Sequence, residues 1–205
     1  MAARKITGGL FVLFILAMLS WVGPVATAVQ LSREDGDRLQ RKIDGIVKNG
    51  SASAAQSKKT PVSESEVNSY LAFNLRDKIP KGLSQPQITT LGNGALGGRV
   101  LLDLDEFNRN RRSQGGLMDP LAYLSGKVPV TARGVLRAAD GRGRFYLEST
   151  EIYGVNLPKP LVQEMVSYFS RTQENPGGFD IDAPFELPAK IRAIVINKGE
   201  AIVTQ

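Results

Sequence analysis

The amino-acid sequence predicts an α+β fold in which antiparallel β-hairpins pack against helices. Three pairs of strand-like segments are each joined by a short glycine-containing turn. Other segments carry apolar residues at the spacing of one helix face. Meandering hairpins with helices laid against one face are typical of α+β domains. The composition, 42% apolar and 22% charged, is that of an ordinary globular protein.

The N-terminus has the order of a secretory signal peptide. Arg4 and Lys5 precede the uncharged apolar run 10–19, and Ala26 and Ala28 are the small residues that a signal peptidase reads. The apolar run is too short for a comfortable span of a bilayer. We therefore expect export to the periplasm or the extracellular space, with cleavage after Ala28. An uncleaved N-terminal membrane anchor is the alternative.

Two missing residue types exclude most catalytic chemistry. The chain has no cysteine and no histidine. Disulfides, thiolate zinc sites, cysteine nucleophiles and Ser-His-Asp catalysis are therefore ruled out. The sequence predicts no enzyme, no cofactor and no metal site. A formal net charge of +6 is too weak to indicate nucleic-acid binding, but it is compatible with contact to an anionic membrane.

The first helix after the signal segment is predicted over 32–48. Ser32 supplies an N-cap, and Gly36 and Gly45 weaken the helix. The small polar segment 49–60 is typical of a flexible loop. The apolar stripe of the helix consists of Leu39, Ile43, Ile46 and Val47.

A second helix is predicted from Ser63 to Pro80. Ser63 and Glu66 have the spacing of a capping box, and Pro80 cannot continue a helix. A third helix is predicted over 160–171, with Pro160 in its first turn. The buried faces of these two helices are predicted to be Val67, Tyr70, Leu71, Leu75 and Ile79, and Leu161, Val162, Met165, Val166 and Phe169.

The hairpins fill most of the remaining chain, together with a strand ending near Leu187. They are predicted at 86–91 with 95–105, at 128–138 with 144–153, and at 191–197 with 200–204. The expected organisation is a signal peptide (1–28), an N-terminal helix and flexible loop (29–60) and a single α+β domain (61–205).

Charged clusters give two further hypotheses. Asp103 and Asp105 share one face of a strand, so they could serve a metal or a hydrolase, or be a solvated strand end; Asp180 and Asp182 repeat the spacing. The cationic residues Arg109, Arg111 and Arg112 precede the apolar Leu117-Met118. They predict contact with anionic lipid head groups, with a solvated basic loop as the alternative.

Four segments together resemble a known family. They are 63–71, 88–103, 152–158 and 185–197, and their order is similar to that in LmeA-like and YceB-like proteins. These are small exported proteins related to the tubular lipid-binding (TULIP) superfamily. The resemblance implies a curved antiparallel sheet wrapped round a long helix as a half-barrel, with an apolar groove for phospholipid and no catalysis. The helix 32–48 and the arginine-rich segment 108–116 depart from the family pattern.

The sequence thus favours non-covalent binding of a phospholipid or similar amphiphile, for lipid transport or maintenance of the cell envelope. The alternatives are an envelope protein–protein interaction module with a filled core and, third, a carboxylate-dependent glycan hydrolase. Any protein partner is unknown. Apolar residues on both faces of several strands fit either a groove or two-sided burial. The predicted groove lining is Leu71, Leu75, Val100, Leu102, Val135, Leu147, Met165, Phe169 and Ile194.

Overall fold

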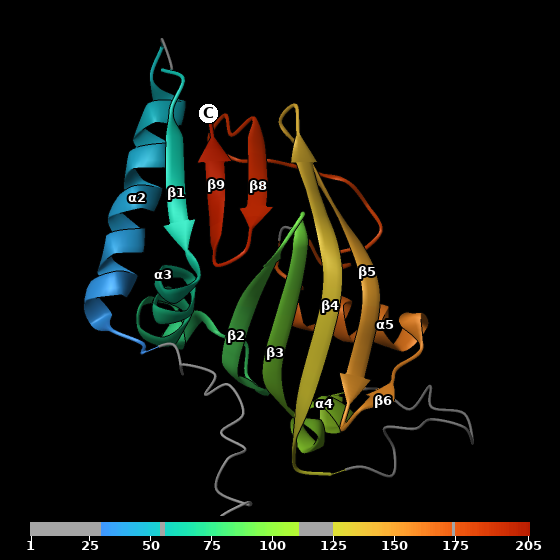
Figure 1. Ribbon diagram of the computed structural model, residues 1–205. Coiled ribbons are helices and arrows are strands. Elements are labelled where there is room, and N and C mark those ends of the chain that lie inside the picture. Colours follow the sequence, from blue (N-terminus) through green and yellow to red (C-terminus); the bar gives the residue numbers. More distant parts are fainter. Residues whose placement is uncertain (1–29, 54–55, 111–124, 174) are drawn as a thin grey trace, which may run out of the picture. The chain divides into compact units, whose positions relative to one another are not determined.

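Four long strands form an antiparallel meander in the computed structural model (Figure 1). The model describes residues 30–53, 56–110, 125–173 and 175–205. The predicted signal peptide therefore lies outside the described residues. The α+β class and the hairpins are confirmed. The four strands are β2 (Leu83–Gly92), β3 (Ala95–Asp103), β4 (Lys127–Ala139) and β5 (Arg142–Ile152).

Tight turns set the register of this meander. Asn93-Gly94 joins β2 to β3 and Asp140-Gly141 joins β4 to β5, and all four residues have positive φ. This is the geometry of the two-residue turn that matches the twist of paired strands. The Asp-Gly-Arg-Gly sequence at 140–143 is therefore a hairpin turn and not a phosphate-binding loop.

The C-terminal hairpin extends the open sheet. β8 (Ala193–Asn197) pairs with β9 (Glu200–Thr204) and meets β4 through the single pair Ala138–Ile194. β1 (Lys59–Ser63) pairs with β9 and was not predicted, because residues 49–60 look like loop. Pro61 has no backbone N–H to donate, which is compatible with the position of β1 at the edge of the sheet. The short strands β6 (Val155–Asn156) and β7 (Phe185–Glu186) pair with β5.

Two helical segments lie beside β1 (Figure 1). The Ser32 hydroxyl accepts a hydrogen bond from the backbone of Asp35, and the Ser63–Glu66 capping box is present. The buried Glu66 also pairs with Lys42 at 2.7 Å. Both predicted helix starts are confirmed. The elements are α2 (Arg33–Ser51), α3 (Glu64–Ser69), the π-helix η1 (Tyr70–Asn74) and the 3-10 helix η2 (Arg76–Lys78).

Two glycines of α2 should respond in opposite directions to alanine. A methyl group at Gly36 would collide with the side-chain oxygen of Asn74 and crowd the carbonyl of Ser69, whereas Gly45 faces open space. Gly45→Ala should raise the unfolding free energy by about 1 kcal/mol through helix propensity. Gly36→Ala should lower it, because η1 must move away from α2. Urea denaturation of both variants checks this, and a stabilised Gly36→Ala would contradict the packing.

The strand predicted over 95–105 ends earlier than expected. The Asp103 carboxylate accepts a hydrogen bond from the backbone N–H of Glu106 and begins helix α4 (Leu104–Asn110). Carboxylates cap helices in this way. Leu104 therefore lies in a helix, and Phe107, one helical turn further on, is only 1% exposed.

Helix α5 (Lys159–Phe169) packs with α4 over one part of the meander. The Phe107 ring meets Tyr168 edge-on at 5.4 Å and stacks on Phe169 at 5.8 Å between ring centroids. The main core contains Leu102, Leu104, Phe107, Val128, Val130, Ile152, Leu161 and Met165. None of the helices in the described ranges is long and apolar enough to cross a membrane.

Candidate functional site

An apolar cavity of about 380 Å³ lies between α5 and the meander and is partly open to solvent. It continues the core rather than lying apart from it, because it shares Leu102, Val130 and Met165 with the core cluster. We call it the apolar cavity. Its lining is Pro80, Leu83, Val100, Leu102, Val130, Ala132, Phe145, Leu147, Thr150, Val162, Met165, Val166, Phe169, Ser170 and Ile181.

Strand alternation explains which sheet residues face the apolar cavity. Val130 and Ala132 are two apart on β4, so they share a face. On β5 the register shifts between Leu147 and Ser149. This bulge brings Leu147 and Thr150, three positions apart, onto the same face. The wall is therefore continuous across both strands.

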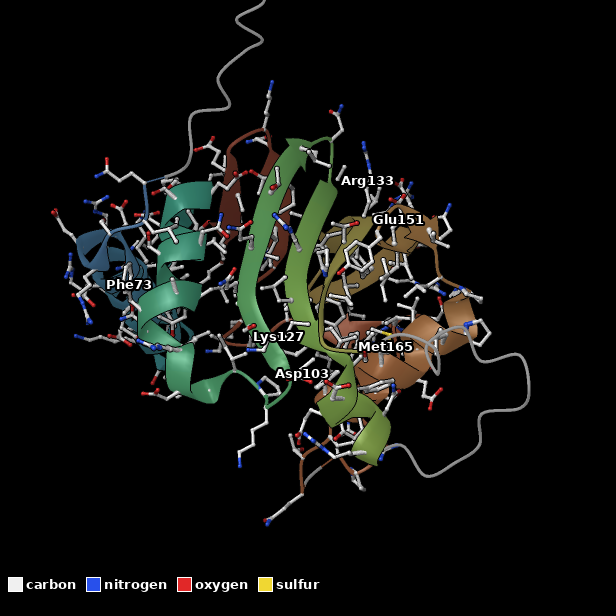
Figure 2. The ribbon with its side chains drawn as sticks, turned by 90° about the horizontal axis from the view of Figure 1, so that it is seen from below. Phe73, Asp103, Lys127, Arg133, Glu151 and Met165 are labelled. Atoms are coloured by element: carbon white, nitrogen blue, oxygen red, sulfur yellow. The ribbon has the colours of Figure 1, made fainter. Side chains whose placement is uncertain are left out.

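Helix α5 supplies the opposite wall. Val162, Met165, Val166 and Phe169 follow the spacing of one helical face, and all four line the apolar cavity. Figure 2 shows Met165 on the side of α5 that faces the strands. The helical periodicity of 160–171 thus predicted this wall correctly.

Within the described ranges, one buried polar atom beside the apolar cavity is unsatisfied. Thr150 is 4% exposed, and its hydroxyl has no hydrogen-bond partner. The other hydroxyl of the lining is fully used: Ser170 donates to the carbonyl of Val166 at 2.6 Å and accepts from the N–H of Phe179 at 2.6 Å. A buried hydroxyl without a partner costs free energy. The Thr150 oxygen is closed off from the cavity, so the surface that a bound molecule would meet there is apolar.

Five of the predicted groove residues meet in the apolar cavity, and four lie elsewhere. Val100, Leu102, Leu147, Met165 and Phe169 line it, whereas Leu71, Leu75, Val135 and Ile194 are absent from the lining.

The four outlying residues have simple structural reasons for their positions. Val135 is an odd number of positions from Val130 and Ala132 on β4, so it lies on the opposite face. Ile194 belongs to β8, which pairs with β4 at Ala138, and it lies outside the lining. Leu71 lies in η1, and Leu75 ends it. The helix that contributes to the apolar cavity is α5.

Sequence reasoning missed several lining residues on the strands. The alternation Val128, Val130, Ala132 would have assigned one face of β4, with Val130 and Ala132 as candidates. Phe145 and Thr150 could not be assigned together, because the bulge in β5 changes the alternation between them.

The acidic pairs have structural roles. Asp103 caps α4, and Asp105 accepts a hydrogen bond from the N–H of Gly126 at 3.1 Å. Asp180 accepts from the N–H of Asp182, whose carboxylate pairs with Lys159 at 2.6 Å. Among the residues that the structure describes, no group of acidic side chains could hold a metal ion.

Of the three arginines predicted to touch a membrane, one falls within the described residues. Arg109 is 68% exposed and pairs with Glu106 at 2.6 Å. This hydrogen bond raises the pKa of the Arg109 guanidinium above its usual value. Arg111 and Arg112 lie outside the described residues. Contact of this segment with an anionic membrane stays a prediction.

Comparison with known proteins adds no name to this geometry. No family model, curated protein or solved structure matches the chain.

Proposed function

We propose that the protein binds an amphiphile non-covalently, with a single acyl chain in the apolar cavity. The observation that carries this proposal is a cavity of about 380 Å³ whose lining, among the residues that the structure describes, is almost entirely apolar. Ligand pockets are typically about 300–1,000 Å³ and mostly apolar, with few polar groups. A single acyl chain fits that chemistry, because the surface of the cavity is almost entirely apolar.

The volume of the apolar cavity favours one acyl chain over two. An apolar cavity of about 150 Å³ holds one benzene, which has six carbons. In proportion, a cavity of about 380 Å³ holds about fifteen chain carbons. Protein interiors leave few voids larger than a water molecule. A filled-core interaction module would have no reason to keep such a space, so the amphiphile is the better proposal.

The sequence pattern supports the same proposal from a separate direction. The resemblance to LmeA-like and YceB-like proteins implies a TULIP-like half-barrel with a lipid groove. An open antiparallel sheet with α5 across it is compatible with that architecture. With export to the cell envelope, as the signal-peptide pattern predicts, the role would be lipid transport or envelope maintenance. No chemistry is assigned, and the protein is proposed not to be an enzyme.

A chain-length series tests the proposal. Saturated 1-monoacylglycerols from octanoyl to myristoyl differ only in methylene groups, and each buried methylene contributes about 0.8 kcal/mol. The affinity of the full-length protein for the monoacylglycerol should therefore rise about fourfold for each added methylene. Isothermal titration calorimetry gives the dissociation constants. Absence of binding at every chain length would refute the proposed function.

A further inference from the structure

A second concave site adjoins the apolar cavity. It has a volume of about 650 Å³ and shares Pro80 and Leu83 with the apolar cavity. We call it the basic groove. It is built by the start of α2, by η1 and η2, and by the first half of β2. Its lining is Leu31, Arg33, Ala72, Phe73, Arg76, Ile79, Pro80, Lys81, Leu83, Ser84, Gln85, Pro86 and Gln87.

The charges of the basic groove have one sign. Arg33, Arg76 and Lys81 line it, and among the residues that the structure describes no carboxylate belongs to the lining. The acidic neighbours of Arg33 are engaged elsewhere, because Arg38 pairs with both Glu34 and Asp35.

The carboxylates near Arg76 and Lys81 lie outside the lining, and Glu106, whose side chain lies close to Gly82, pairs with Arg109 at 2.6 Å. Asp77, next to Arg76, is exposed and outside the lining. The three cations come from α2, η2 and the turn before β2, so the fold brings together charges that are distant in sequence.

These cations are available to a ligand. Within the described part of the chain, none of the three forms an ion pair with a carboxylate. Arg33 instead makes a cation–π contact with Phe73, whose ring centroid is 5.3 Å from the guanidinium carbon. Figure 2 shows Phe73 on the η1 side of the molecule and Met165 on the α5 side, with the near ends of β2 and β3 between them. The basic groove and the apolar cavity thus meet across the start of β2.

The backbone of β2 adds polar groups at the same place. The pairing of β2 with β3 is interrupted between Ser84 and Gln87, and Gln85 has a φ of 51°. A non-glycine residue in this region is strained and persists only where its surroundings hold it. Ser84, Gln85 and Gln87 all line the basic groove, so neutral donors lie beside the three cations.

We propose that the basic groove binds the phosphate head group of the amphiphile whose chain occupies the apolar cavity. This inference rests on the proposed function, and it narrows the ligand to an anionic, phosphate-bearing, single-chain lipid. Arginine and lysine form charge-assisted hydrogen bonds to phosphate oxygens, and these are stronger than neutral ones. The shared residues Pro80 and Leu83 lie where the head group would join the chain.

The test compares two lipids that differ only in the phosphate, 1-myristoyl lysophosphatidic acid and 1-monomyristin. Inorganic phosphate is the third probe. The variant is Arg33→Gln/Arg76→Gln/Lys81→Gln. The matched control is Arg41→Gln/Lys58→Gln/Lys78→Gln, which removes the same number of exposed charges outside the basic groove. Binding of each probe to the full-length protein is measured by calorimetry at low and high ionic strength.

The groove variant should bind the lysophosphatidic acid at least about tenfold more weakly than the wild type, with monomyristin affinity unchanged. Binding of the phosphate lipid should also weaken with salt, because exposed charges are screened. The control should behave as wild type. Equal losses for both lipids, or none, would overturn the inference. Inorganic phosphate binding as tightly as the phosphate lipid would overturn it in favour of a free-phosphate site. If monomyristin does not bind the wild type, the proposed function itself fails.

Discussion

Replacing Ala132 with phenylalanine should weaken binding of 1-monomyristin by about a thousandfold while the protein stays folded. Ala132 lies in the wall of the apolar cavity, at the middle of β4. A phenyl ring takes up about 150 Å³ by comparison with benzene, which displaces about five chain carbons of a myristoyl group. At about 0.8 kcal/mol per buried methylene, the loss is about 4 kcal/mol. Calorimetric titration measures it.

The control for this variant is Thr131→Phe. Thr131 is the neighbour of Ala132 on β4, points to the other face and is exposed. The Thr131→Phe variant should bind monomyristin as the wild type does. In a filled core, Ala132→Phe would instead cost about 1–3 kcal/mol of stability through overpacking. A strongly destabilised Ala132→Phe, or one with unchanged affinity, would therefore contradict the account.

The second large effect is expected at Phe107. Its ring is fully buried and lies against Tyr168 and Phe169. Truncation of a buried phenylalanine to alanine typically costs about 3–5 kcal/mol, because the space left behind collapses only partly. Phe107→Ala should therefore lower the unfolding free energy of the ligand-free protein by about that amount. Urea denaturation followed by circular dichroism gives the value.

Phe169→Ala is the informative comparison. Phe169 is partly buried and lines the apolar cavity, so part of its ring faces the cavity and not a packed side chain. Its truncation should cost clearly less than that of Phe107, while affinity for monomyristin falls. Equal and severe destabilisation in the two variants, with no lipid bound to the wild type, would favour the interaction module with a filled core.

The sequence allowed prediction of the elements whose signals are local. The Ser32 cap, the Ser63–Glu66 capping box and the Asp140-Gly141 turn each depend on residues within a few positions, and each is present. The face of α5 followed in the same way from helical periodicity.

Elements that depend on distant partners could not be predicted. β1 is a strand because it pairs with β9, over 130 residues later. α4 begins where Asp103 caps it, and its two large apolar residues, Leu104 and Phe107, are too few to give a periodic pattern. The bulge in β5 likewise depends on how that strand pairs with β4.

The candidate site also contains residues that local patterns predict and residues that depend on distant partners. The residues predicted from α5 and from β3 reached the apolar cavity, because periodicity fixes which face they occupy. Leu71 and Leu75 did not, because the choice of which helix covers the meander is made by tertiary packing. Arg33, Arg76 and Lys81 share no local motif, so only the folded chain shows that they line one groove.

The dependence of affinity on chain length, extended from octanoyl to stearoyl monoacylglycerols, tests the central claim most directly. In the wild type, affinity should rise about fourfold per methylene and level off near about fifteen carbons, where the apolar cavity is full. In Ala132→Phe the plateau should come about six carbons earlier, because the ring occupies that space. Affinity that continues to rise through stearoyl equally in both proteins would show adsorption to an outer surface and contradict the account.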